Sequence, residues 1–282
     1  MVKFFDKLSA KRAKSNNDLN AYGIIMRHMN APPMTIDMHV DPETFEHLQK
    51  LVEETWSRLG QEDAHWSVIT DEKFRKDRLK SHKDEFFKMG EGDIARVDAA
   101  FSRVGASLSN VESVMDFGCG VGRLSIPLAR KTKYVLGVDI SAAHLHEAKA
   151  NIDQQGCGNI ELFRAECIDD IRKLPEFELV YSIIVLQHNP PPVMLKILDA
   201  LCSRVKPDGY LYVQAQTYRS GYSYSAKDHL ENPSEEMEMH ILPQHVFLGT
   251  IQDAGLTILE IMEDGAAGDL QYTSQTVLAR KR

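Results

Sequence analysis

From Val111 onward, the sequence alternates between short apolar runs typical of strands and stretches with helical periodicity. "VMDF", "YVLGVDI", "IELFRA", "FELVYSIIVL" and "KPDGYLYVQAQ" predict strands, and "SAAHLHEAKANI" and "PVMLKILDALCSRV" are among the helical stretches between them. The fourth run is almost uninterruptedly apolar, as expected of a strand buried on both faces of a parallel sheet. This alternation predicts a doubly wound α/β sheet with helices on both faces.

The C-terminal part departs from the alternation. Residues 217–240 are polar and tyrosine-rich and show no clear period. A helical stretch then ends at Gly255, and "LTILEIMED" and "YTSQTVLARK" follow as two strands joined by "GAAGDLQ". That connection suits an antiparallel hairpin better than a crossover.

Residues 1–107 predict a helical extension that could act as a lid. Asp41 is a good N-cap and Pro42 suits the first helical turn, so we expect a helix over 42–59 that ends at Gly60. A loop carrying His65 and Trp66 should follow. Two further helices are expected, from about residue 71 to 89 and from 94 to 104.

A glycine-rich turn follows the strand "VMDF". It places Gly118, Gly120 and Gly122 at alternate positions directly before a helix. Such a turn brings backbone N–H groups and the positive end of a helix to one point, and glycine lets a ligand approach closely. The dinucleotide fingerprint would need a glycine where this chain has Arg123, and the Gly-Lys-Ser/Thr ending of a phosphate loop is absent.

An acidic residue ends the next strand. Asp139 follows Asp116 by 23 residues, in "YVLGVDIS". Neighbouring strands of a parallel sheet end side by side, so this carboxylate can accept hydrogen bonds from both hydroxyls of a ribose. The glycine turn and the acid together predict a site for a nucleoside-containing ligand.

The successive motifs "VMDFGCGVGRLSIPLA", "VLGVDIS", "FRAE", "FELVYSIIVLQH" and "KPDGYLYV" resemble those of the class I S-adenosylmethionine-dependent methyltransferases. The resemblance covers residues 108–282 and implies a methyltransferase domain there, with S-adenosyl-L-methionine as cofactor. It also implies a seven-stranded, mostly parallel sheet of strand order 3-2-1-4-5-7-6, whose last strand is antiparallel.

The resemblance further implies roles for single residues. The methionine part of the cofactor would lie against the first strand end and the glycine turn, at Asp116, Gly118, Cys119, Gly120 and Gly122. Asp139 would hold the ribose and Ile140 the adenine, with Glu166 and Cys167 after the third strand near the adenine amine. Ser182 and Ile184, at the end of the fourth strand, would approach the sulfonium.

Methyl transfer to a hydroxyl or an amine needs the acceptor held beside the methyl group and often needs a base. His188, in "VLQHNPPP" after the fourth strand, is the predicted base, because imidazole titrates near neutral pH. A structural role at the head of the next helix is the alternative. The predicted acceptor contacts are Gln187, Trp66, Tyr222 and His240.

Composition bears on the acceptor. The net charge is −8 and the pI is near 5.8, which disfavours duplex nucleic acid, and "QHNPPP" is not the Asn-Pro-Pro-Tyr motif of nucleic-acid amine methylases. We therefore expect a small-molecule acceptor, most readily a hydroxylated metabolite or sugar methylated on oxygen. The alternatives are a protein or RNA methyltransferase that docks through the basic segment at residues 1–15, and a non-catalytic cofactor-binding partner subunit. A nicotinamide enzyme is disfavoured by the glycine spacing.

Cysteine usage and hydropathy bear on metal binding, the cellular compartment and membrane insertion. The four cysteines form no CxxC and no Cys/His set with zinc spacing, so we expect free thiols, no metal ligands and a cytoplasmic location. No apolar run is long enough to cross a bilayer. The oligomeric state is left open.

Overall fold

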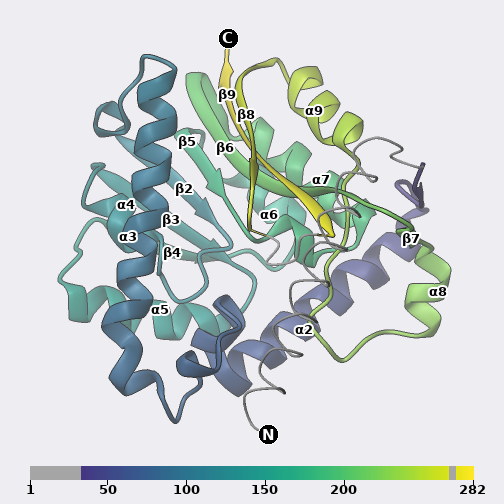
Figure 1. The fold of residues 1–282 in the computed structure, drawn as a ribbon, viewed down its shortest axis with the longest axis horizontal. Helices are drawn as coiled ribbons and strands as arrows, with labels where there is room; N and C mark the ends of the chain where they lie inside the picture. Colours follow the sequence, from purple (N-terminus) through teal and green to yellow (C-terminus); the bar gives the residue numbers. More distant parts are fainter. Residues whose placement is uncertain (1–32, 267–270) are drawn as a thin grey trace, which may run out of the picture.

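The computed structural model describes residues 33–266 and 271–282. Its central sheet is seven-stranded in the order β4-β3-β2-β5-β6-β9-β8, which is the predicted 3-2-1-4-5-7-6. Only β9 runs antiparallel to its neighbours β6 and β8, so the predicted hairpin at the C-terminal end is confirmed (Figure 1). The strands are β2 Ser113–Phe117, β3 Tyr134–Asp139, β4 Ile160–Arg164, β5 Phe177–Ser182, β6 Val205–Arg219, β8 Leu256–Asp264 and β9 Tyr272–Lys281.

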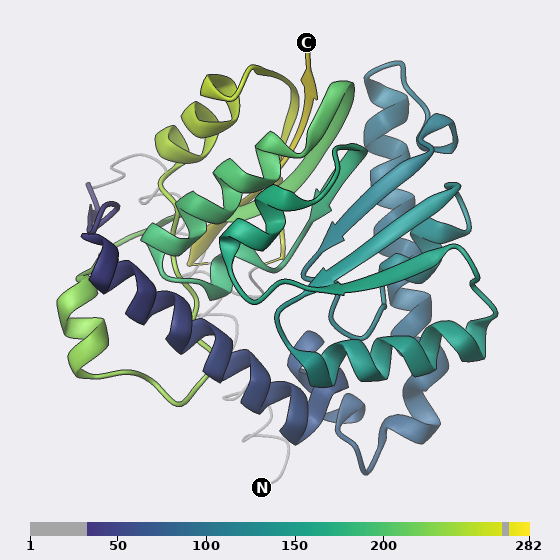
Figure 2. The same ribbon diagram turned by 180° about the vertical axis from the view of Figure 1, so that it is seen from behind.

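Helices cover both faces of the sheet. One face packs against α3 and α4, and the other against α6, α7 and α9 (Figures 1 and 2). A hydrophobic core lies on each face of the sheet. Successive side chains of β2 point into opposite cores, so Val114 packs on the side of α3 and Met115 on the side of α7. The helices are α2 Pro42–Val68, α3 Leu79–Arg103, α4 Ser125–Ala129, α5 Ala142–Gln155, α6 Ile168–Lys173, α7 Pro191–Ser203, α8 Ala226–Glu231 and α9 Gln244–Asp253.

The expected end of α2 at Gly60 is wrong. The helix begins as predicted, with Asp41 accepting from the Thr44 amide, but it continues past Gly60 to Val68 with a kink at Asp63. A Cβ at Gly60 would lie 2.5 Å from Ser141 Oγ and 2.8 Å from His144 Nδ1. Glycine is present here because α2 crosses the start of α5 at close range, which sequence pattern alone does not reveal.

The two helices expected over 71–89 and 94–104 are also wrong, because they form one helix, α3, preceded by the short turn Glu72–Phe74. A Cβ at Gly90 would lie 2.4 Å from the Arg123 carbonyl oxygen, so this glycine too marks a close contact rather than a helix end. Glycine costs a helix only about 1 kcal/mol. Burial of Phe86, Ile94 and Phe101 on the same helix outweighs that cost.

Residues 33–40 and the polar segment after β6 meet beside the sheet. A two-residue strand, β1 Thr35–Ile36, pairs in parallel with β7 Ser223–Tyr224, and α8 follows. The basic segment at residues 1–15 lies outside the described residues. Within the described part of the chain, no helix combines the length and apolarity that a membrane crossing requires.

Candidate cofactor and acceptor site

The turn after β2 is shaped by glycines with positive φ. Gly118 and Gly120 have φ of 76° and 53°. A Cβ at Gly118 would come 2.2 Å from Val185 Cγ2, and one at Gly120 would come 2.6 Å from Val68 Cγ2. The Gly118 and Cys119 amides donate to the Val138 carbonyl oxygen at 2.8 and 3.0 Å, which fixes the turn to the end of β3. A residue other than glycine would therefore clash with the rest of the protein at either position.

Asp139 joins the two strand ends. Its Oδ2 accepts from the Gly120 amide at 2.8 Å and its Oδ1 from the Ser141 amide at 2.9 Å. Each carboxylate oxygen can accept a second hydrogen bond. Asp139 lines the main cavity, so these free acceptor positions are available to a ligand.

Asp116 is buried beneath the turn and is not among the described residues that line the cavity. It accepts a 2.5 Å hydrogen bond from Ser125 Oγ, and burial raises the pKa of its carboxyl to about 6. Arg123, also buried, pairs with Asp93 at 2.5 Å, and its Nε has no hydrogen-bond partner among the described residues. Asp116 thus supports the turn from below, whereas Arg123 lines the cavity.

A cavity of about 470 Å³ opens at the carboxyl ends of β2, β3, β4 and β5. This is within the usual range for small-molecule sites. The helix α2 runs across this edge of the sheet and contributes Gln49, Val52 and Trp56 to the wall (Figure 1). Of the residues predicted to hold the cofactor, those that line the cavity are Gly118, Cys119, Gly120, Asp139, Ile140, Glu166, Cys167 and Ile184.

The end of β5 is conformationally strained. Ile184 has a φ of 58°, which is rare for a β-branched residue, and its amide donates to Gln214 Oε1 at 2.8 Å. Such backbone costs on the order of 1–3 kcal/mol and is found disproportionately at functional sites. Ser182, two residues earlier at the end of β5, is fully buried outside the cavity lining. Gly122 is also buried and outside the lining.

Gln187 is the centre of a buried hydrogen-bond network. Its Oε1 accepts from Gln214 Nε2 and Gln216 Nε2, both at 3.0 Å, and its backbone carbonyl accepts from the His240 amide at 2.7 Å. This network fixes the 3₁₀ turn Leu186–His188 against β6. Gln187 lines the cavity, but most of its hydrogen-bonding capacity is used inside the protein.

His188 also lines the cavity and lies edge-on to Trp56, with ring centroids 5.5 Å apart. Its Nδ1 is 2.9 Å from the Glu238 carbonyl oxygen, so Nδ1 carries the proton and Nε2 has the lone pair. Burial lowers the pKa of the imidazole to about 4. The expectation that this histidine titrates near neutral pH is therefore wrong, because the cavity wall removes it from water.

The other predicted acceptor contacts lie elsewhere. Trp66 is on α2, not in a loop, and its ring stacks on the Arg75 guanidinium at 3.5 Å. Tyr222 and His240 hydrogen-bond to each other at 3.0 Å outside the main cavity. Glu166, which was predicted to contact the cofactor and not the acceptor, lines the cavity but is largely exposed, and it pairs with Arg164 at 2.8 Å.

Trp56 and His144 line the cavity but were not predicted from the sequence. Trp56 lies on the apolar stripe of α2, where its spacing is that of an ordinary core residue. His144, near the start of α5, contacts Ser67 Oγ through Nε2 at 2.8 Å, while its buried Nδ1 has no partner among the described residues. This nitrogen faces Gly60 of α2, where an added Cβ would lie 2.8 Å away, so His144 marks the close approach of α2 and α5 beside the cavity.

Comparison with known proteins agrees with this geometry. Residues 114–209 match the family model described as a methyltransferase domain. The structure resembles that of magnesium protoporphyrin IX methyltransferase from Synechocystis PCC 6803 with bound S-adenosylhomocysteine, with a TM-score of 0.59 and 21% identity over 83% of this chain and 99% of that chain. It also resembles the N-methyltransferase NodS from Bradyrhizobium japonicum WM9, with a TM-score of 0.54 and 14% identity over 82% of this chain and 98% of that chain.

Relatives by sequence are partial matches. The ubiquinone biosynthesis O-methyltransferase of Acinetobacter baylyi is 30% identical over 36% of this chain and 42% of its own length. A 23S rRNA (uracil-C5)-methyltransferase of Mannheimia succiniciproducens is 31% identical over 36% of this chain and 23% of its own length. The chain thus spans less than half of these relatives. Its fold is that of the class I S-adenosylmethionine-dependent methyltransferases, as predicted, and the match to the methyltransferase-domain model falls on the strands and turns that line the cavity.

Proposed function

We propose that the whole chain is an S-adenosylmethionine-dependent methyltransferase that acts on a hydroxyl group of a small molecule. The observation that carries the proposal is the two-sided cavity at the carboxyl edge of the sheet. One side consists of the glycine turn and Asp139, and the other of apolar side chains around His188.

The cofactor half fits S-adenosylmethionine. The turn at Gly118 and Gly120 lines the cavity and has no room for a Cβ, and Asp139 keeps free acceptor positions for ribose hydroxyls. Arg123 supplies a buried positive charge for the carboxylate of the methionine part. When bound, the cofactor supplies a methyl group on a sulfonium.

The acceptor half favours a partly apolar, flat molecule. Trp56, Val193, Ile197, Met237 and Met239 line it. Methionine walls adapt to ligand shape, and an aromatic ring offers a stacking surface. Walls of this kind, with few polar groups, suit a hydroxylated aromatic metabolite better than a sugar.

His188 would orient the acceptor hydroxyl. Because its pKa is lowered to about 4, the imidazole is unprotonated at neutral pH and can take the hydroxyl proton only as the methyl group is transferred. With Nδ1 donating to the Glu238 carbonyl, Nε2 is left as a hydrogen-bond acceptor, and it faces Gln187 Nε2 at 3.3 Å; the acceptor hydroxyl would take the place of that contact. Gln187 would hold His188 in place through the network with Gln214 and Gln216.

The test is a methyl-transfer assay with labelled S-adenosylmethionine and a panel of hydroxylated aromatic metabolites, sugars, RNA and protein. We expect uptake by an aromatic hydroxyl compound. His188→Ala should then lower kcat by about 10²–10⁴-fold and leave S-adenosylhomocysteine affinity unchanged. His146→Ala, at an exposed position on α5, is the matched control and should retain full activity. Uptake by RNA or protein alone, or full activity of His188→Ala, would refute the assignment.

A further inference from the structure

Met237 and Met239 form one side of the main cavity, called the acceptor wall below, and a second, smaller pocket lies behind it. It measures about 40 Å³ and shares Trp56 and His188 with the main cavity. The segment after α8 separates the two spaces, and its side chains alternate. Met237 and Met239 line the main cavity, whereas Glu236, Glu238 and His240 line the small pocket.

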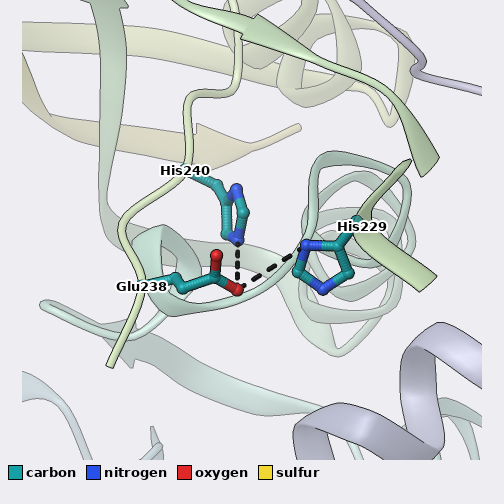
Figure 3. A group of neighbouring side chains, drawn as sticks. All are labelled: His229, Glu238 and His240. Carbon is teal, nitrogen blue, oxygen red and sulfur yellow. Dashed lines mark ion pairs between the residues drawn. The ribbon is translucent and has the colours of Figure 1, made fainter. Parts of the chain in front are cut away.

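Three side chains converge in this small pocket. Glu238 and His240 come from the segment after α8, and His229 comes from α8 itself (Figure 3). The Glu238 Oε2 atom lies 3.6 Å from His229 Nδ1 and 3.7 Å from His240 Nε2. All three ligand atoms lie within 4.8 Å of one another.

The two separations from Glu238 are too long for hydrogen bonds but close to those of a metal shell, and the two imidazole nitrogens, which lie within 4.8 Å of each other, would approach further around an ion. Bonds of about 2.0–2.2 Å to a tetrahedral zinc ion place neighbouring ligand atoms roughly 3.3–3.5 Å apart. The two measured contacts of Glu238 therefore need to close by only a few tenths of an ångström. In Figure 3 the two ring nitrogens and the carboxylate point at a common space.

The surroundings hold the imidazoles in a ligating orientation. His240 Nδ1 is 3.0 Å from Tyr222 OH, so a proton on Nδ1 leaves the Nε2 lone pair facing Glu238. An outer hydrogen bond of this kind is what metal-bound histidines usually make. The Tyr224 ring packs against both imidazoles, with centroids 5.5 Å from His229 and 5.3 Å from His240.

We propose that His229 Nδ1, the Glu238 carboxylate and His240 Nε2 bind a divalent transition-metal ion, with Zn²⁺ favoured by the two imidazoles and one carboxylate. The small pocket leaves a fourth position that a water molecule can fill. The ion joins α8 to the segment that carries Met237 and Met239. It thereby holds the acceptor wall in place, because the backbone of Glu238 and His240 is bonded to the turn Leu186–His188.

The test uses the tag-free full chain, stripped with a chelator and dialysed, and needs neither cofactor nor acceptor. Calorimetric titration with Zn²⁺ should show one tight site per chain. Co²⁺ in its place should give the intense visible absorption of a tetrahedral site. Mg²⁺, which prefers six oxygen ligands, should not compete.

Variants locate the site. Glu238→Gln keeps the size of the side chain but removes its charge and should weaken Zn²⁺ binding by more than about 100-fold, while Tyr222→Phe should weaken it about tenfold. His229→Gln gives an independent reading if circular dichroism shows Glu238→Gln to be misfolded. His245→Gln, at an exposed position of α9, should bind like the wild type.

A wild-type chain without a stoichiometric site would overturn the proposal, as would Glu238→Gln and His229→Gln chains that bind Zn²⁺ like the wild type. Glu238 would then only be a neighbour of the two imidazoles, without a metal ion between them. Because no methyl transfer is measured, either result leaves the proposed methyltransferase function untouched.

Discussion

Gly118 shows how a single residue shapes the cofactor half of the cavity. Its positive φ and its contact with Val185 exclude every other side chain. The glycine turn and Asp139 could be found from the sequence because backbone constraints restrict residue choice locally. Trp56 and His144 could not, since an aromatic residue on a helix looks the same whether it faces a core or a ligand.

Gly118→Ala should destabilise the fold and abolish S-adenosylhomocysteine binding. A left-handed alanine costs about 1–2 kcal/mol, and forced overpacking adds about 1–3 kcal/mol. Urea unfolding and calorimetry measure the two effects. Gly156→Ala isolates the first effect, because Gly156 has a φ of 65° with nothing within 4 Å of its Cβ position. Equal losses in the two variants would show that the contact with Val185 is unimportant.

Asp116 should make stability depend on pH in an unusual direction. Its folded pKa of about 6 exceeds the ordinary 3.8, so the native state binds the proton more tightly than the unfolded state does. The resulting stability is present in full at low pH and is lost as pH rises through 6. Relative to Asp116→Asn, the wild type should lose on the order of 2 kcal/mol between pH 4 and pH 7. Urea unfolding of both chains measures the difference, and a difference that stays constant with pH would contradict the burial argument.

At the scale of elements, α2 links the N-terminal region to the site. Its start was predictable from Asp41 and Pro42, since capping is local. Its end was not, because Gly60 is selected by contact with α5, which lies far away in the sequence. The same reason explains why Gly90 looked like a break in α3. A glycine in a helical stretch can mark either the end of the helix or a place where another element packs closely against it. A single sequence does not distinguish these two cases.

Gly60→Ala should separate α2 from α5. The added methyl would collide with Ser141 Oγ and His144 Nδ1, and overpacking of this kind costs about 1–3 kcal/mol. Because α2 carries Trp56, S-adenosylhomocysteine binding should weaken as well. Gly92→Ala is the matched control, since it is a helical glycine on α3 with nothing within 4 Å of the added Cβ. It should stabilise the fold by up to about 1 kcal/mol. Thermal unfolding of both variants measures the two effects. If Gly60→Ala stabilises the fold, α2 and α5 can move apart at little cost and the prediction is contradicted.

At the scale of the whole molecule, the alternation of strands and helices predicted a doubly wound sheet. The strand order came from the resemblance to the class I methyltransferases, and the structure confirms it. The polar segment 217–240 gave no such pattern. Its placement depends on hydrogen bonds to the turn at Gln187 and His188 and on the short pairing of β1 with β7. The acceptor wall and the histidine cluster were therefore visible only in three dimensions.

Calorimetric titration of the wild-type chain with S-adenosylhomocysteine, beside Asp139→Ala and an NADH control, tests the proposed cofactor site most directly. One site per chain is expected for S-adenosylhomocysteine and none for NADH. Loss of the charged acceptor of the ribose hydroxyls should weaken binding by roughly 10- to 100-fold in Asp139→Ala. Asp153→Ala, at an exposed position of α5, should bind like the wild type. A wild-type chain that does not bind S-adenosylhomocysteine, or an Asp139→Ala chain that binds it with unchanged affinity, would contradict the assignment of the cavity.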